Sequence, residues 1–231
     1  MTVRVLVVYG SQTGNSEKVI KMIAKKWEAN EGLKFKVENI IEGNEVDDDM
    51  WDGMKDRFDV ILVCTSSYGE GDPPDNYGHF LVKLIHGAQS GAKPLTGMQH
   101  AVLGEGSSVY EDTFQNNPRL TDKLLEECGS RRLARRHEID VGGEEDESVG
   151  RNLFSQAVFE ALQALPSAHS PPAADWAEPR VSHKEPVTRL TEKTEQGILG
   201  GGSKLKGLFI PVIALIGVTC GLFYTYFIEN Q

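Results

Sequence analysis

The feature that most restricts the fold of this chain is an alternation of two kinds of segment over residues 1–165. Apolar runs with the composition of β-strands are separated by stretches whose apolar residues recur at helical spacing. Such an alternation predicts a parallel sheet covered by helices on both faces. The runs VLVVY and VILVC are almost continuously apolar, which is typical of central strands. The five strands are expected at Val3–Tyr9, Phe35–Ile40, Phe58–Cys64, Gln99–Leu103 and near Ala134–Val141.

Two amphipathic helices can be placed from the spacing of their apolar residues. The first, Ser16–Glu28, has an apolar face made of Val19, Ile20, Ile23, Ala24 and Trp27. The last, Val149–Leu165, has one made of Leu153, Phe154, Ala157, Val158, Ala161 and Leu162. We therefore predict a doubly wound α/β domain over residues 1–165, in which a ligand would bind beyond the carboxyl ends of the strands.

Charge is distributed unevenly along the chain. Residues 1–165 hold 18 Lys and Arg against 28 Asp and Glu, which accounts for the whole net charge of −10. A nucleic-acid-binding protein would need a basic face, so we expect no nucleic acid as a partner. An acidic surface suits docking to a basic protein, although a merely solvated acidic face is as good an explanation. The acidic residues considered for docking are Asp47, Asp48, Asp49, Asp72, Asp75, Glu111 and Asp112.

The C-terminal part differs from the domain. Residues 166–206 are rich in Pro, Ser, Ala and Gly and are expected to form a flexible linker. Residues 207–228 contain no charge over 22 positions, enough for a helix across a bilayer, with residues 229–231 as a short tail beyond it. A buried core helix or the signal for a glycolipid anchor are the alternatives. The lysines before the span indicate a single-pass tail anchor with the domain in the cytosol, and favour the endoplasmic reticulum over the mitochondrial outer membrane.

The first candidate binding loop is Gly10–Ser16, with the sequence GSQTGNS. It lies between the first predicted strand and the first predicted helix, where free N–H groups and the positive end of the helix favour an anion. It lacks the Gly-Lys-Ser/Thr of a Walker A loop and does not read Gly-x-Gly-x-x-Gly, so nucleoside triphosphates and dinucleotides lose support. An ordinary turn that caps a helix is the alternative.

Two further loops each carry Gly-x-Gly and one tyrosine. TSSYGEGDPPDN, Thr65–Asn76, follows the third predicted strand, and GEGSSVYED, Gly104–Asp112, follows the fourth. Tyrosines on neighbouring loops at one sheet edge are placed to enclose a flat aromatic ligand, and glycines allow its polar edge to approach the backbone. For either tyrosine alone a packing role would be the simpler explanation.

The motifs SQTGNSEKV, SSYGEGDPPDN and LGEGSSVYEDTF, in this order, resemble the FMN-binding flavodoxin-like domain, especially the FMN module of diflavin reductases. The resemblance covers roughly residues 1–165 and implies strand order 2-1-3-4-5 and non-covalently bound FMN. It implies that the phosphate is held by Ser11, Gln12, Thr13, Gly14 and Asn15. It also implies that Tyr68 and Tyr110 face the two sides of the isoalloxazine ring. The residues expected around the ring are Ser66, Gly69, Glu70, Gly71, Leu103 and Gly104, with Glu145 from the acidic loop Asp140–Glu147.

The chain departs from diflavin reductases in three respects. No FAD or NADPH module follows the domain, the third loop is longer than usual, and the expected anchor is C-terminal. No catalytic acid, base or nucleophile and no metal site is indicated, since the histidines are scattered. The leading hypothesis is an electron carrier that receives electrons from a separate FAD/NAD(P)H-dependent reductase and passes them to a membrane-associated acceptor such as a haem protein. The alternatives are an autonomous FMN oxidoreductase, for example a quinone reductase, and a cofactor-free interaction module.

Overall fold

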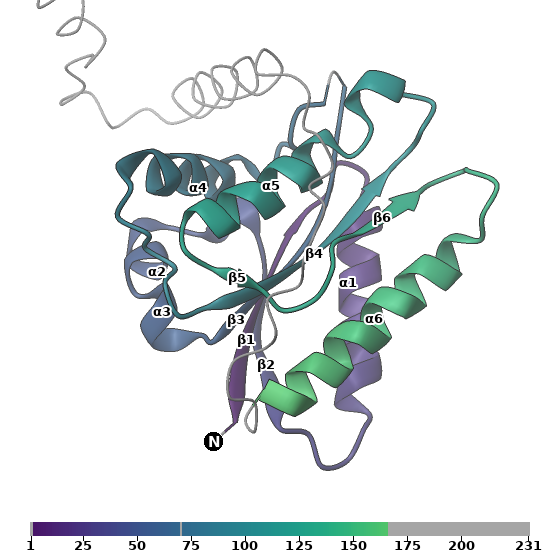
Figure 1. The fold of residues 1–231 in the computed structure, drawn as a ribbon. Helices are drawn as coiled ribbons and strands as arrows, with labels where there is room; N and C mark the ends of the chain where they lie inside the picture. The colour runs from purple at the N-terminus through teal and green to yellow at the C-terminus, as the bar shows by residue number, and fades with distance from the viewer. Residues whose placement is uncertain (1, 70, 166–231) are drawn as a thin grey trace, which may run out of the picture. The chain divides into compact units, whose positions relative to one another are not determined.

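A computed structural model of the chain describes residues 2–69 and 71–165 (Figure 1). The strands are β1 Val3–Gly10, β2 Phe35–Glu42, β3 Val60–Ser66, β4 Gln99–Gly106, β5 Arg131–Arg132 and β6 His137–Asp140. They form one sheet in the order β2-β1-β3-β4-β5, with β6 also paired to β4. All the pairs are parallel, as the alternation of segments predicts.

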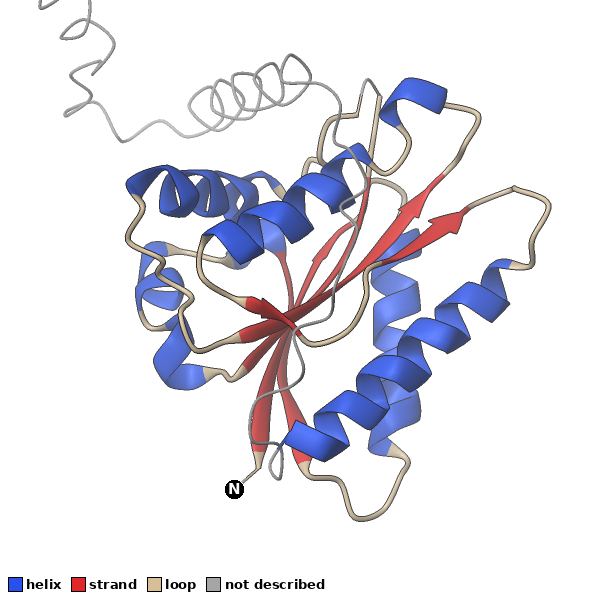
Figure 2. Cartoon of the chain, in the orientation of Figure 1, coloured by secondary structure: helices blue, strands red, loops and turns tan. Residues whose placement is uncertain are grey.

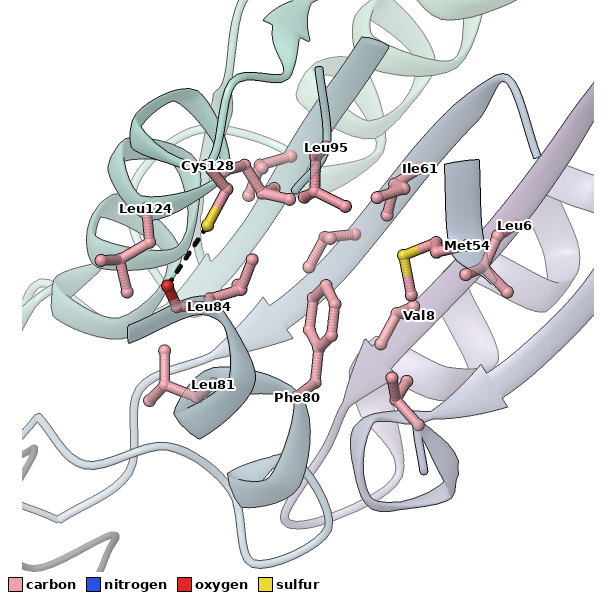
Figure 3. Packing of buried hydrophobic residues seen from close by; sticks show 14 of the residues in the cluster. Leu6, Val8, Met54, Ile61, Phe80, Leu81, Leu84, Leu95, Leu124 and Cys128 are labelled. Carbon is pink, nitrogen blue, oxygen red and sulfur yellow. Dashed lines mark hydrogen bonds between the residues drawn. The ribbon is translucent and has the colours of Figure 1, made fainter. Parts of the chain in front are cut away.

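Helices cover both faces of the sheet (Figure 2). They are α1 Asn15–Glu28, α2 Asp48–Asp52, α3 Met54–Arg57, α4 Gly78–Ser90, α5 Asn116–Glu127 and α6 Glu147–Ala164, with short 3-10 turns η1 Gly43–Glu45 and η2 Glu111–Thr113. One core cluster combines side chains of α4 and α5 with Leu6 and Val8 of β1 (Figure 3). The other combines α1 and α6 with Val5 and Val7. The alternate residues of β1 therefore point to opposite faces and are buried on both.

The fifth strand is where the structure differs from the predicted segment Ala134–Val141. It is split into β5 and β6, which pair with Gln99–His100 and with Leu103–Gly106 of β4. The four residues 133–136 stand opposite only two residues of β4, so two residues are extra and the ladder is interrupted. Arg136, in the interruption, is ion-paired to Asp122 of α5 and to Glu138 of β6. These ion pairs join the interrupted strand to the neighbouring helix.

The helical predictions hold with one exception. Along α1, all five residues predicted for the apolar face are buried. Along α6, Phe154, Val158 and Leu162 are fully buried, but Leu153 is 56% exposed. The buried stripe recurs every four residues from Phe154, and Leu153 lies about 100° away around the helix, so the prediction for Leu153 was wrong.

The predicted linker, span and tail, residues 166–231, lie outside the described residues. Within residues 2–69 and 71–165, no helix combines the length and the apolar character needed to cross a bilayer.

Candidate functional site

Four loops meet at the carboxyl edge of the sheet, after β1, β3, β4 and β6 (Figure 1). Because parallel strands place their carboxyl ends at one edge, loops that are distant in sequence become neighbours there. This is the edge to which the sequence assigned the three candidate loops and the acidic loop 140–147. In chain order these are the first loop, Gly10–Ser16, the second, Thr65–Asn76, the third, Gly104–Asp112, and the fourth, Asp140–Glu147.

The first loop leads directly into α1 through Gly14, whose φ of 84° is in the left-handed region. No side chain caps the helix, so its first N–H groups are available to a ligand. Thr13 and Asn15 are exposed beside this helix end, and no Lys or Arg lies in the loop. The helix end, hydroxyls and amides form the donor set that an anionic phosphate requires.

Gln12 joins the first loop to the second. Its Nε2 donates to Asp75 Oδ2 at 2.9 Å, and its Oε1 accepts from the backbone N–H of Asp75 at 3.0 Å. The backbone N–H of Ser11 donates to Asn76 Oδ1 at 2.9 Å. The Gln12 side chain thus holds the first and second loops together, a role that the sequence motif does not indicate.

The second loop is a tight reversal that presents Tyr68. The N–H of Tyr68 donates to Asp72 O and the N–H of Asp72 donates to Tyr68 O, both at 2.8 Å. Gly69 and Gly71 have φ values of 53° and 91°, which residues with side chains seldom adopt. Tyr68 is 52% exposed, which is unusual for a tyrosine on such an ordered turn. Glu70 lies outside the described residues.

A pocket of about 220 Å³ lies between the second and third loops. Tyr68 and Tyr110 both line it, and Tyr110 is 63% exposed. Tyr110 is held because its carbonyl accepts from the N–H groups of Thr113 and Phe114, at 2.9 and 2.8 Å. The remaining lining residues are Ser67, Gly69, Gly106, Ser107, Thr113, Phe114 and Gln115. The two tyrosines therefore border the same pocket despite the longer third loop.

Besides Glu145, four of the predicted ring residues are not among those that line this pocket. Gly71 is buried on the second loop, where its carbonyl accepts from Asn116 Nδ2 at 2.9 Å. Leu103 is fully buried in the core. Ser66 ends β3, and its carbonyl accepts from Asn117 Nδ2 at 3.0 Å. Gly104 is required for packing, because a Cβ there would lie 1.9 Å from Gln115 Oε1. Glu145 is exposed on the fourth loop and is not among the residues that line the pocket.

Sequence reasoning missed Thr113, Phe114 and Gln115, which line the pocket. The sequence around these residues carries no pattern that would identify them. Gln115, for example, reaches the pocket through a left-handed backbone, with φ of 60°, which the sequence does not predict. Phe114 is half-buried, and an aromatic residue two positions after Asp112 is not distinguished by sequence from an ordinary packing residue.

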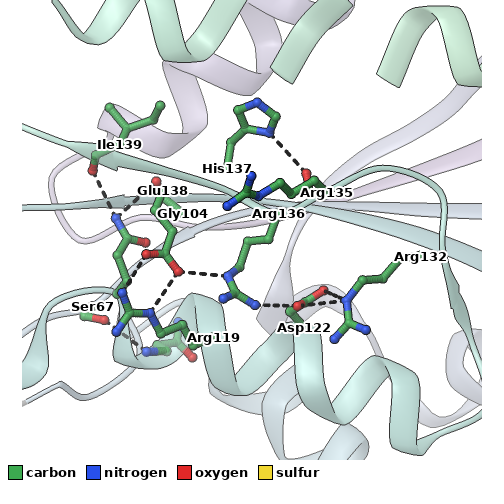
Figure 4. Close-up of polar contacts among 12 residues, drawn as sticks. Ser67, Gly104, Arg119, Asp122, Arg132, Arg135, Arg136, His137, Glu138 and Ile139 are labelled. Carbon is green, nitrogen blue, oxygen red and sulfur yellow. Dashed lines mark hydrogen bonds and ion pairs between the residues drawn. The ribbon is translucent and has the colours of Figure 1, made fainter. Parts of the chain in front are cut away.

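Behind the site, a charge network ties α5 to β5 and β6 (Figure 4). Arg119 binds both carboxylate oxygens of Glu138, at 2.8 and 2.6 Å. Burial acts to raise the pKa of Glu138, but the bonds and charges of Arg119 and Arg136 outweigh it and hold the pKa below its usual range. The pKa of Asp122 is likewise lowered, because His100, Arg132 and Arg136 together outweigh the effect of its burial. The carboxylates of the network are therefore ionised at neutral pH.

His100 is the buried histidine that the sequence analysis did not single out. It is fully buried, with Nδ1 2.9 Å from Ser130 Oγ and Nε2 3.2 Å from Asp122 Oδ1. Burial lowers the pKa of His100 and outweighs the hydrogen bond and the charge of Asp122, which act to raise it. Full burial keeps this Ser-His-Asp grouping away from any substrate, so it is a packing element.

The residues of the site fit FMN in three respects. The uncapped end of α1 supplies donors for a phosphate without a cation, and the pocket offers two exposed tyrosines for a flat ring. The bonds of Gln12 place these two parts next to each other. A nucleoside triphosphate site would require a lysine that this loop does not have.

Comparison with known proteins agrees with this geometry. The flavodoxin family model matches residues 7–151. NADPH–cytochrome P450 reductase of Musca domestica is 35% identical over 130 residues, which are 55% of this chain and 18% of that enzyme. The corresponding reductase of Aspergillus niger is 27% identical over 230 residues, 94% of this chain and 32% of that enzyme. The chain thus spans less than a third of these curated relatives.

Solved flavodoxins share the fold. A short-chain flavodoxin associated with a bacterial microcompartment has a TM-score of 0.54 at 25% identity, covering 70% of this chain and 99% of that one. The flavodoxin of Streptococcus pneumonia TIGR4 has a TM-score of 0.53 at 24% identity, covering 68% and 97%. The chain belongs to the flavodoxin family, and FMN, the cofactor expected from its loops, is the cofactor of that family.

Proposed function

We propose that this chain is an FMN-dependent electron carrier held at a membrane by residues 207–228, with a separate reductase as donor and a membrane-associated redox protein as acceptor. The observation that carries the proposal is the pocket of about 220 Å³ bordered by Tyr68 and Tyr110, beside the uncapped end of α1. Such a site would bind a cofactor with a flat ring and a phosphate.

Bound FMN supplies the ability to accept and release electrons, and the chain supplies binding, orientation and electrostatics. The backbone N–H groups at the start of α1, with Ser11 and Thr13, would hold the phosphate. Tyr68 and Tyr110 would stack on the ring, which contributes about 0.5–1.5 kcal/mol for each aromatic pair beyond area burial. The absence of cations from the first loop means that the phosphate charge is not neutralised there by a side chain.

Exposed acidic residues support the proposed donor and acceptor. Glu111 and Asp112 are exposed directly beyond Tyr110, and Asp47, Asp48 and Asp49 are exposed on α2 and the residue before it. Asp48 is ion-paired to Lys83, so it contributes less to the surface charge than its neighbours. Exposed carboxylates near the pocket rim support docking of a donor and an acceptor with basic surfaces, whose association would slow as salt is added.

A titration tests the cofactor. The purified chain in detergent is expected to show a flavin absorption spectrum, to lose it when FMN is removed, and to regain it with FMN but not with riboflavin at the same concentration. A chain that stays colourless with excess FMN would identify a cofactor-free interaction module instead.

Electron transfer is tested separately. Reduction of the chain by NADPH is expected only when an FAD-containing reductase is added, and its rate should fall with ionic strength. Oxidation of NADPH by the chain alone would show an autonomous oxidoreductase and would contradict the carrier.

Membrane attachment rests on the uncharged stretch 207–228. In cells, the chain is expected to resist extraction from membranes at alkaline pH, and deletion of residues 207–231 should release it. A chain that is extracted without detergent would contradict the anchor. Co-localisation with markers of the endoplasmic reticulum and of the mitochondrial outer membrane would decide between the two, and we propose the former.

A further inference from the structure

Three consecutive amide side chains, Gln115, Asn116 and Asn117, lie at the start of α5 behind the pocket. Gln115 Nε2 donates to the carbonyl of Ile139 at 3.0 Å and to that of Gly104 at 3.3 Å (Figure 4). Gly104 is the first residue of the third loop, near the end of β4, and Ile139 directly precedes the fourth loop. The Gln115 side chain therefore joins α5 to the ends of β4 and β6, which the backbone ladder already pairs with each other.

The other two amides reach the second loop. Asn116 Nδ2 donates to Gly71 O at 2.9 Å. Asn117 Nδ2 donates to Ser66 O at 3.0 Å, and its backbone N–H donates to Ser67 Oγ at 3.0 Å. Together the three side chains connect the start of α5 to the second, third and fourth loops.

These residues do not serve the helix on which they lie. Asn is a preferred capping residue, yet the cap position of α5 is Gln115, and no side chain caps this helix. Gln115 has a φ of 60°, a conformation that residues other than Gly, Asn and Asp seldom adopt. The local backbone is thus arranged to direct the amides towards the loops.

The amides are also not the best choice for stability. Gln115 and Asn117 are fully buried, and Gln115 Oε1 and Asn117 Oδ1 have no hydrogen-bond partner among the described residues. A buried polar atom without a partner destabilises a fold, so a well-packed apolar side chain would stabilise this position better. The presence of two such amides next to the pocket points to a requirement of the site rather than of the fold.

Three of the four glycines in the two Gly-x-Gly motifs lie so close to these amides that a side chain in their place would contact them. A Cβ on Gly104 would lie 1.9 Å from Gln115 Oε1, and one on Gly106 would lie 3.2 Å from its Nε2. A Cβ on Gly71 would lie 3.0 Å from Asn116 Nδ2. Three glycines that the sequence motif suggests for approach to a ligand instead make room for the side chains that hold the loops.

We propose that Gln115, Asn116 and Asn117 are positioning residues, which hold the second, third and fourth loops in one arrangement and thereby set the affinity for the flavin ring and its midpoint potential. The inference rests on the proposed FMN function. Gln115 also borders the pocket, together with Gly69 and Gly106, so a shift of this amide moves the wall that the ring would face.

Two variants of the chain of residues 1–231 in detergent test this role. Asn116→Ala removes the bond to Gly71, and Gln115→Asn keeps an amide that tolerates the left-handed backbone but is one methylene too short to span Gly104 and Ile139. The matched control is Asn30→Ala, which removes an amide that donates to Lys26 O and Trp27 O at 3.0 and 3.1 Å, at the far end of α1.

The dissociation constants of FMN and of riboflavin are each expected to rise on the order of tenfold in both site variants, as is usual for supporting contacts. Both ligands should be affected equally, because the loops concerned face the ring rather than the phosphate. The midpoint potential of the bound flavin should shift in the site variants and stay at the wild-type value in Asn30→Ala. The urea midpoint of the apoprotein should be no lower for Asn116→Ala than for the control.

Wild-type dissociation constants and midpoint potential in both site variants would overturn the inference. So would an affinity loss that merely follows a loss of stability while the potential stays unchanged, because that would show a structural role only. A wild-type chain that binds no FMN would overturn the proposed function, which the variants do not address, so the two failures are distinguishable.

Discussion

Gln12 and Asp75 form a reciprocal pair, in which the amide of one residue satisfies both the backbone N–H and the carboxylate of the other. The two residues are 63 positions apart in sequence, so the pair fixes the first loop against the second. A phosphate site and a ring site must keep a set distance if one molecule is to fill both.

Gln12→Leu should therefore weaken FMN binding. Each lost hydrogen bond contributes about 0.5–1.5 kcal/mol, so the dissociation constant should rise about fivefold to a hundredfold. Fluorescence titration with FMN and riboflavin measures it, and the loss should be larger for FMN, because only FMN uses both loops. Gln156→Leu on α6, which removes an exposed bond to Glu160, is the control, and equal losses in both variants would contradict the prediction.

Tyr68→Ala and Tyr110→Ala should each raise the FMN dissociation constant about twofold to tenfold, from the loss of stacking. Both tyrosines are more than half exposed, so the free energy of unfolding of the apoprotein should change by less than about 0.5 kcal/mol. The comparison is Tyr77→Ala, since Tyr77 is fully buried and its hydroxyl lies 3.1 Å from Thr121 Oγ1. That variant should lose about 3–5 kcal/mol of stability, measured by urea unfolding. If Tyr68→Ala unfolds the domain while the surviving fraction binds FMN normally, Tyr68 has a packing role.

Gly104→Ala should destabilise the fold by about 1–3 kcal/mol, because the added methyl group meets Gln115 Oε1 and Pro118 Cβ. Gln115→Gly keeps the left-handed backbone and removes one of these contacts, so Gly104→Ala should cost less in that background. A double-mutant cycle on the urea unfolding free energy measures the coupling. Additive effects would show that Gly104 is required for a reason other than Gln115.

Stability should fall between pH 7 and pH 5 because of His100. Its pKa is lowered in the folded state, so below about 6.5 the unfolded chain takes up a proton that the folded chain does not. The contribution of His100 to the free energy of unfolding is fully present above the pKa that the residue has in the unfolded chain. It is lost as the pH falls towards the pKa that the residue has in the folded chain. His100→Asn should flatten this part of the profile in urea unfolding at pH 7.5, 6.5 and 5.5, and a wild-type slope in the variant would contradict the assignment.

A second loss of stability is expected at more acidic pH. The pKa values of Asp122 and Glu138 are lowered in the fold, so their contribution is present above about pH 4.5 and is lost as the pH falls further.

The sequence predicts the sheet and its two helical layers well, because strands buried on both faces are almost continuously apolar whereas the helices between them have apolar residues at helical spacing. In β1, the adjacent residues Leu6 and Val7 are accordingly buried on opposite faces. It also brings the candidate loops to one edge of the sheet, since that follows from the parallel strands alone. It does not predict that the last strand is split, because the ion pair between Arg136 and Asp122 that accompanies the split joins residues of two different elements, 14 positions apart.

Within the site, the sequence predicts exposed features better than supporting ones. Tyr68 and Tyr110 could be identified because an aromatic residue in a glycine-rich loop is unusual. The amide of Gln115 could not, because its importance depends on a left-handed backbone and on two carbonyl groups from other strands. The need for glycine at position 104 could not be predicted either, because it depends on contact with Gln115, eleven residues later.

The split of the last strand has a consequence for association between copies of the chain. An edge strand with a continuous row of unpaired backbone groups is a template for adding another strand. Here β5 ends after two residues, and the residues 133–136 that follow break the row and carry two arginines. At the opposite edge, exposed Lys36 and Glu38 alternate along β2, next to a register shift between Val5 and Leu6. Both edges of the sheet are thus poor templates for the addition of a strand from another copy of the chain.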